Sequence, residues 1–229
     1  MDKKTLIAVL GTVKKAWSII YNGTNAYING GSEASIDNLH DGAFTAEGWF
    51  YSDASNTDTQ ILVMKSNYST SGWWIRTVNG NQLQGALFCA TTNANVTFAN
   101  TLRTDKKWHH VALTFDDAGD RKTRVWVDGV LVGTSDAGTG AVVPDAGDIL
   151  WICGTQYVGW LQGRGGWVRI SNVVRYTTTF VPQTRFIAPT VDANTVRLFK
   201  VNEGTGTTIT DYSANAQNAT LFNGTWKKV

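Results

Sequence analysis

Cysteine, proline and glutamate are all scarce in this chain of 229 residues. The two cysteines, Cys89 and Cys153, lie far apart and outside any CxxC spacing, so the sequence indicates neither a disulfide framework nor a cysteine metal site. We expect both to be buried free thiols; the alternative is a single disulfide bond between them. The only glutamates are Glu33, Glu47 and Glu203.

Long apolar runs and a strong excess of charge are also missing. Apolar residues make up 42% of the chain, but no run reaches the length that a membrane span needs. The net charge of +2 comes from the ends, because residues 1–15 carry +3, Lys227 and Lys228 add +2, and residues 16–226 carry −3. A body without a basic stripe argues against nucleic-acid binding, while the basic ends suit an acidic partner.

Residues 1–16 need separate treatment because they resemble the basic and apolar regions of a signal peptide. However, Gly11 interrupts the apolar part, Lys14 and Lys15 follow it, and no A-x-A cleavage site is present. We therefore expect residues 1–16 to form a basic arm or first strand that docks on a partner. Residues 17–229 are expected to form one domain.

Side chains alternate with a period of two through most of this domain, which is typical of β-strands. The two adjacent histidines, His109 and His110, lie in such a stretch, between Trp108 and Asp116. Because neighbouring side chains in a strand point to opposite faces, these histidines are not expected to share a metal ion. We interpret them as parts of the architecture.

Turn signals separate the predicted strands. Asp128–Gly129 and Asn79–Gly80 each lie between alternating stretches and predict two-residue hairpins. No segment has the apolar spacing of a helix. The sequence thus predicts about a dozen short strands, which indicate an all-β sandwich or barrel. Besides the strands already mentioned, the pattern predicts strands over residues 18–21, 60–65, 149–154, 166–170, 196–201 and 219–222.

Five stretches follow one another along the chain: "WSIIYNGTNAYINGG…GAFTAEGWFY", "KKWHHVALTFDD", "TRVWVDGVLVGT", "LQGRGGWVRISNVVRY" and "DANTVRLFKVNEGTGTTITDYSANAQNATLFNGTWKKV". In this order they resemble the laminin-G-like domains of the concanavalin-A-like lectin/glucanase group. The resemblance covers about residues 17–229. It implies an antiparallel two-sheet β-sandwich of the jelly-roll type, with the last strand near the first. We expect Trp108 and Trp226 to fill its core.

The resemblance implies several activities, of which catalysis is the least supported. Glucanases of this fold carry E-x-D-x-(x)-E on one strand, and none of the three glutamates begins such a motif. Many relatives bind one structural Ca²⁺, but two of their acidic positions are Ala26 and Gly166–Trp167 here. The acids left for a calcium site are Glu47, Glu203 and Asp211.

Sugar binding depends on exposed aromatic side chains beside polar groups. The stretch "QYVGWLQGRGGW" places Tyr157, Trp160 and Trp167 in glycine-rich, loop-like sequence with Gln162 and Arg164. Trp73 and Trp74 are adjacent in a strand, so at most one of them faces the core; we include Trp73 in the candidate site. Burial of these rings under the loop or at a subunit interface is the alternative.

The sequence therefore favours a non-catalytic carbohydrate-binding protein. Laminin-G-like domains occur in phage tail and head-decoration proteins, so we expect a virion protein, anchored to other virion proteins by residues 1–16 and binding a glycan or cell-surface polysaccharide. Homo-oligomers are compatible with this prediction. The alternatives are a secreted or cell-surface lectin-like module and, third, a glycan lyase or hydrolase.

Overall fold

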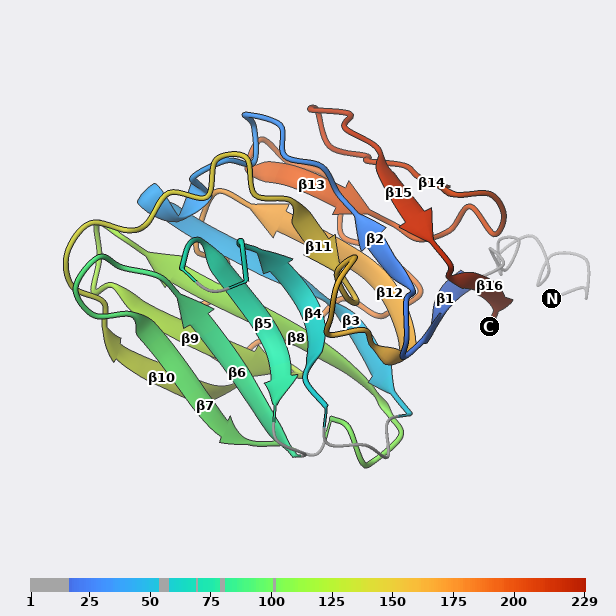
Figure 1. Cartoon of the computed structure of the whole chain (residues 1–229), viewed down its shortest axis with the longest axis horizontal. Helices are drawn as coiled ribbons and strands as arrows, with labels where there is room; N and C mark the ends of the chain where they lie inside the picture. The colour runs from blue at the N-terminus through green and yellow to red at the C-terminus, as the bar shows by residue number, and fades with distance from the viewer. Residues whose placement is uncertain (1–16, 54–57, 69, 79–80, 101) are drawn as a thin grey trace, which may run out of the picture.

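Two antiparallel sheets of eight strands each lie face to face (Figure 1). The structure is a computed structural model, and it describes residues 17–53, 58–68, 70–78, 81–100 and 102–229. The sandwich predicted from the sequence is confirmed. The predicted arm, residues 1–16, lies outside the described residues.

Sheet A contains the strands that begin and end the described chain. Its order is β10 (Val130–Ala137), β9 (Lys122–Val127), β8 (Trp108–Asp116), β3 (Ala43–Ser52), β12 (Gln162–Ser171), β1 (Trp17–Asn22) and β16 (Thr225–Lys228), with β13 (Thr195–Phe199) also paired to β12. Trp226 of β16 pairs with Ile19 of β1, so the last strand lies beside the first, as predicted.

Sheet B covers the other side of the core. Its order is β14 (Thr208–Ile209), β15 (Ala219–Phe222), β2 (Tyr27–Asn29), β11 (Leu150–Ile152), β4 (Gln60–Lys65), β5 (Trp73–Val78), β6 (Gln82–Leu87) and β7 (Ala94–Ala99). Within the described ranges the only helical element is a 3-10 turn, Leu39–Asp41. No helix in this part of the chain has the length and apolar character needed to cross a bilayer.

The turn prediction is confirmed at Asp128–Gly129. Both residues have positive φ, 50° and 81°, as the two central positions of a type I′ hairpin require. The Asn79–Gly80 turn lies outside the described residues, but the strands on either side of it, β5 and β6, pair in antiparallel register.

The main core lies between the sheets and takes every second residue of the strands. Val111, Leu113 and Phe115 of β8 point into it. Cys89 and Cys153 are both buried and free, as expected. Burial raises the pKa of the Cys153 thiol far above its usual range, so this group is an inert apolar side chain.

The outer face of sheet A has a cover of its own, formed by residues 172–194. The indole nitrogens of Trp49 and Trp167 donate hydrogen bonds to the carbonyls of Gln183 and Thr184, at 2.9 and 3.0 Å. Trp108 lies on this outer face and is half-buried, so its predicted place in the core is wrong. Its strand alternation puts it opposite the inward-facing Val111.

The two histidines point to different surroundings, as predicted. His110 is completely buried beneath residues 172–194, and its Nε2 lies 2.9 Å from Oε2 of Glu47. His109 bonds instead to Asp128 and Asp105 at the end of the strand, at 2.7 and 2.8 Å.

Candidate functional site

A second apolar cluster lies on the outer face of sheet B, facing away from the main core. In each contributing strand the neighbouring residues point the other way; Trp151 belongs to this cluster, whereas Leu150 and Ile152 belong to the core. The buried members are Ile61, Met64, Trp74, Ala86, Phe88 and Trp151. All six are at most 8% exposed, so they form a second, smaller core on this face of sheet B.

A row of aromatic side chains crosses this face. The ring of Phe222 on β15 stacks on Tyr27 of β2 with centroids 4.8 Å apart, and Tyr27 meets the edge of Trp151 of β11 at 5.5 Å. These three strands are consecutive neighbours in sheet B, followed by β4. The row therefore runs across the strands from the edge of the molecule toward β4.

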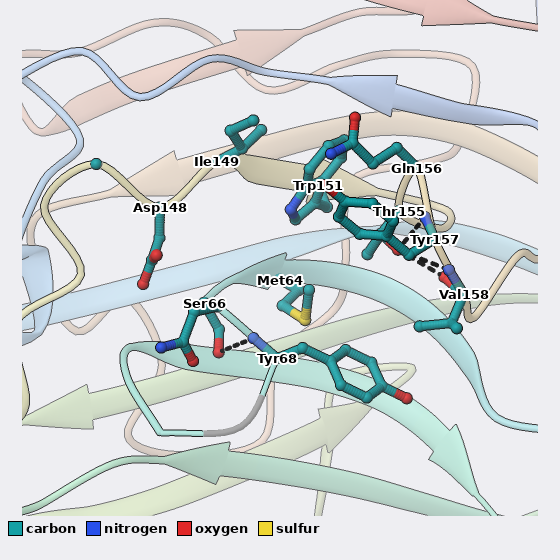
Figure 2. A pocket seen from close by; sticks show the side chains of 12 residues that line it. Met64, Ser66, Tyr68, Asp148, Ile149, Trp151, Thr155, Gln156, Tyr157 and Val158 are labelled. Atoms are coloured by element: carbon teal, nitrogen blue, oxygen red, sulfur yellow. Dashed lines mark hydrogen bonds between the residues drawn. The ribbon is translucent and has the colours of Figure 1, made fainter.

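The row leads to a cavity of about 490 Å³ above β11 and β4 (Figure 2). Trp151 and Met64 line it, and Figure 2 shows Tyr157 and Tyr68 on opposite sides of the Met64 side chain. Tyr157 is 71% exposed and Tyr68 is 36% exposed. The polar side chains at the cavity are Ser66, Asn67, Asp148, Thr155 and Gln156.

Residues 155–160 hold Tyr157 in a fixed turn. The Thr155 hydroxyl accepts hydrogen bonds from the backbone N–H groups of Tyr157 and Val158, at 3.1 and 2.9 Å. The Trp160 indole then donates to the Thr155 carbonyl at 2.6 Å. Gly159 allows this turn because its φ is +74° and an added Cβ would meet the Ile61 side chain at 2.6 Å.

A buried ammonium orders the opposite wall of the cavity. Nζ of Lys65 lies 2.8 Å from Oδ1 of Asp37 and 2.8 Å from each of the carbonyl oxygens of Asp145 and Asp148. These three acceptors use all three N–H donors of the ammonium, which is completely buried. Because Asp148 lines the cavity, Lys65 fixes the backbone from which its carboxylate projects.

The structure brings together only part of the predicted sugar site. Tyr157 lies at the cavity, and Trp160 lies next to it with its indole nitrogen bound to the loop backbone. Trp73 and Trp167 are 0% and 1% exposed, so the prediction that they face a sugar is wrong. Trp73 points into the main core, and Trp167 is covered by residues 172–194.

Gln162 and Arg164 are also separated from Tyr157, although only a few residues lie between them in the sequence. Both belong to β12, which is in sheet A, whereas the cavity is on sheet B. Arg164 pairs with Tyr51 of β3 and stacks on its ring, 4.8 Å from the centroid. Including these two residues in one site with Tyr157 is therefore wrong.

The three acids predicted for calcium do not fit a shared site. Glu47 accepts from His110, Arg169 and Tyr176, and the Glu203 carboxylate accepts two backbone N–H groups. Asp211 accepts from backbone and hydroxyl donors around its own turn. Across the described ranges no three His, Cys, Asp or Glu side chains are grouped so that they could hold a metal ion.

Sequence reasoning missed Tyr27, Tyr68, Trp151 and Asp148. A signal was available for Trp151, since it lies between Leu150 and Ile152 and an alternating strand puts it on the other face. Tyr68 lies in a loop with φ of +79°, and no local pattern indicates that it meets residues 155–158.

A family model described as the concanavalin A-like lectin/glucanases superfamily matches residues 22–175. The chain belongs to this superfamily. The matched region includes the cavity and Tyr157, and the laminin-G-like resemblance of the sequence is confirmed. A comparison with curated protein sequences finds no match.

The solved structures that match this chain are distant in sequence. Domains LG4-5 of the mouse laminin α1 chain match with a TM-score of 0.51 and 11% identity, over 74% of this chain and 48% of that chain. The botulinum neurotoxin serotype C1 binding domain gives a TM-score of 0.38 and 17% identity, over 48% of this chain and 27% of that one. The chain spans less than half of either solved chain.

Proposed function

We propose that this chain is a non-catalytic carbohydrate-binding module and that its ligand lies in the cavity above β11 and β4. The observation that carries the proposal is the exposed pair Tyr157 and Tyr68 at the end of the row Phe222, Tyr27 and Trp151. Aromatic faces offer rigid apolar surface for the C–H faces of sugar rings. A concave site with a few polar groups on a rigid scaffold is the usual form of a small-ligand site.

The polar side chains suit hydroxyl recognition. Asp148 is a carboxylate acceptor whose Oδ2 takes one hydrogen bond from Ser71, which leaves capacity for ligand hydroxyls. Gln156 is an exposed amide at the cavity that can both donate and accept, whereas the Asn67 amide already bonds to Thr70 through both its nitrogen and its oxygen. From Phe222 to Trp151 the row spans three adjacent strands, about 10 Å at a spacing of about 4.8 Å. That length gives room for more than one sugar ring.

The carboxylates support binding over glycoside hydrolysis. A retaining glycosidase needs two carboxyl groups about 5–5.5 Å apart, one of them free to attack the sugar. Glu33 pairs with Arg197, Glu47 is enclosed by three donors, and Glu203 binds backbone N–H groups. Each glutamate thus has a structural role, and none of them lines the cavity.

A glycan array on the full chain tests the proposal. We expect specific spots for the wild type and about tenfold weaker binding for Tyr157→Ala, from the loss of about 1.5 kcal/mol of apolar contact. The matched control is Tyr212→Ala, which removes an exposed tyrosine away from the cavity. A blank array, or equal loss in both variants, would refute carbohydrate binding at this cavity.

The finer assignments from the sequence are also proposals. The virion location and the anchoring role of residues 1–16 are tested by deleting residues 2–15 and measuring incorporation into particles; unchanged incorporation would contradict anchoring. A role for calcium is tested by repeating the array with a chelator. Secretion as a lectin-like module is tested by the intact mass of the host-made protein, because a retained Met1 would exclude a cleaved leader.

A further inference from the structure

A second row, of cationic and aromatic side chains, crosses the outer face of sheet A. Arg164, Tyr51 and Trp108 are direct cross-strand partners on β12, β3 and β8. Arg164 lies 4.8 Å from the centroid of the Tyr51 ring, and the Tyr51 and Trp108 centroids are 5.9 Å apart. Arg185 from residues 172–194 lies over Trp108 at 5.0 Å and over Phe186 at 3.8 Å. We refer to these five residues as the arginine–aromatic row.

The two guanidinium groups of this row lack carboxylate partners among the described residues. Five other arginines of this part of the chain form salt bridges with Asp or Glu: Arg121, Arg124, Arg169, Arg175 and Arg197. Burial and the nearby charge of Arg164 lower the pKa of Arg185, which agrees with two like charges held close together. Such an arrangement attracts an anion.

The arginines keep their anion-binding edges free. A guanidinium that stacks on a ring uses its flat face, so the N–H groups on its edge can still hold a carboxylate or sulfate. Two acids adjoin the row, and both already have donors. Asp53 accepts from the Tyr51 hydroxyl at 3.0 Å, and Asp128, which lines the same cavity as Arg185, accepts from His109 and from the His110 backbone. The row therefore presents unmatched positive charge.

A cavity of about 470 Å³ adjoins the row. Trp108, Arg185 and Phe186 line it, together with Trp49, Asp128, Pro182 and Thr184. Phe186 is 54% exposed, and Trp108 is half-buried with its ring at the cavity. The site thus combines flat apolar surface with two cations.

We propose that the arginine–aromatic row is a second binding site, for the acidic group of a saccharide. A carboxylate or a sulfate would satisfy Arg164 and Arg185 alike. The site is independent of the cavity on sheet B and lies on the opposite side of the sandwich, so it goes beyond the function proposed above. The net charge of −3 over residues 16–226 favours a saccharide over a nucleic acid, which needs a longer basic surface.

Two sites on opposite faces have a physical consequence. One molecule is able to hold two glycan chains, or two parts of one chain, without any contact between the sites. When both sites bind the same polymer, its overall affinity exceeds that of either site alone.

Calorimetric titration of the full chain tests the proposal with four probes: oligogalacturonate, a sulfated dextran oligosaccharide, neutral dextran and oligothymidylate. The variant is Arg164→Gln with Arg185→Gln. Its control is Lys122→Gln with Arg124→Gln, which removes two charges from β9, on the same face of sheet A. Thermal melts verify that both variants fold; if the first melts early, Arg185→Gln alone replaces it.

We expect at least one acidic saccharide to bind the wild type. Its affinity for the Arg164/Arg185 variant should be about tenfold lower, and its affinity for the control variant should be within about twofold of the wild-type value. Comparing the affinities for oligogalacturonate and for the sulfated dextran oligosaccharide then shows whether the row prefers a carboxylate or a sulfate. Absence of acidic saccharide binding, equal loss in both variants, or tighter binding of oligothymidylate would overturn the proposal. Tyr157→Ala distinguishes the arginine–aromatic row from the cavity on sheet B, because we expect this variant to bind acidic saccharides as the wild type does. Loss of acidic saccharide binding in Tyr157→Ala would show that the row is not a separate site.

Discussion

Glu47 and Arg169 face each other across strands β3 and β12, with Oε1 of Glu47 2.7 Å from Nε of Arg169. The other oxygen of Glu47 accepts from His110 and from the Tyr176 hydroxyl, at 2.9 and 2.7 Å. Tyr176 belongs to residues 172–194, so this buried carboxylate ties that cover to sheet A.

Replacing the carboxylate tests this role. In Glu47→Gln the shape is kept, but Arg169 loses its counter-charge in a buried place, and we expect a loss of about 3–5 kcal/mol in the free energy of unfolding. Urea unfolding measures it. The control is Glu203→Gln, whose partners are backbone N–H groups at a more exposed turn. A loss below about 1 kcal/mol in Glu47→Gln would contradict the role.

The same carboxylate makes stability depend on acid pH. Burial raises the pKa of Glu47, but hydrogen bonding from His110 and the charge of Arg169 outweigh this and hold it below its ordinary value of 4.5. A pKa depressed in the folded state gives stability that is present above pH 4.5 and is lost as the pH falls through the folded value. The wild type should therefore lose more stability than Glu47→Gln below that pH; parallel curves would contradict this.

His109 contributes at the other end of the pH range. Its hydrogen bond to Asp128 raises its pKa above 6.5, although partial burial opposes this. Its stabilisation is then fully present below pH 6.5 and is lost as the pH rises through the folded pKa. We expect the difference in unfolding free energy between the wild type and His109→Gln to shrink as the pH rises above about 6.5. A constant difference would contradict this.

In the proposed site, Trp160 holds the loop that carries Tyr157. Trp160→Phe removes the hydrogen bond to the Thr155 carbonyl, which is worth about 1 kcal/mol, and we expect about fivefold weaker glycan binding. The matched control is Trp226→Phe, which removes a similar hydrogen bond to the Gly206 carbonyl, away from the cavity. Calorimetric titration with a glycan from the array distinguishes the two; equal affinities would contradict a positioning role for Trp160.

Lys65 stabilises the cavity wall from inside. The methionine side chain in Lys65→Met has a volume similar to that of lysine, but Asp37, Asp145 and the carbonyl of Asp148 lose their cation. We expect a loss of about 3–5 kcal/mol in the free energy of unfolding, measured in urea. Lys122→Met, on the partly exposed surface of β9, is the control and should change stability by less than about 0.5 kcal/mol. Equal effects of the two changes would contradict the role.

Most of the fold was predictable because alternation and turn chemistry are local. Asp128–Gly129 set its hairpin, and the period of two placed His109 and His110 on different faces. Trp108 was misplaced because alternation gives two faces but does not say which one is inner. Both faces of sheet A are covered here, one by sheet B and the other by residues 172–194.

The site was less predictable because it is formed by residues from different loops. The run from Gln162 to Gly165 was interpreted as loop-like on account of its glycines, but it belongs to strand β12, which the sequence predicted only over residues 166–170. Gly165 allows close packing there, since an added Cβ would lie 3.0 Å from the Tyr21 ring, and the register shifts after it. Tyr68 meets the loop of Tyr157 only through the pairing of β4 with β11.

The most direct test of the central claim is a titration of ¹⁵N-labelled protein with the strongest neutral glycan from the array, observed at the tryptophan indole N–H signals. We predict that the signals of Trp151, at the cavity, and Trp160, in the adjoining loop, shift with the added glycan. Those of Trp49 and Trp167, beneath residues 172–194, should stay in place. Shifts at Trp49 and Trp167 without any at Trp151 would contradict a carbohydrate site on sheet B.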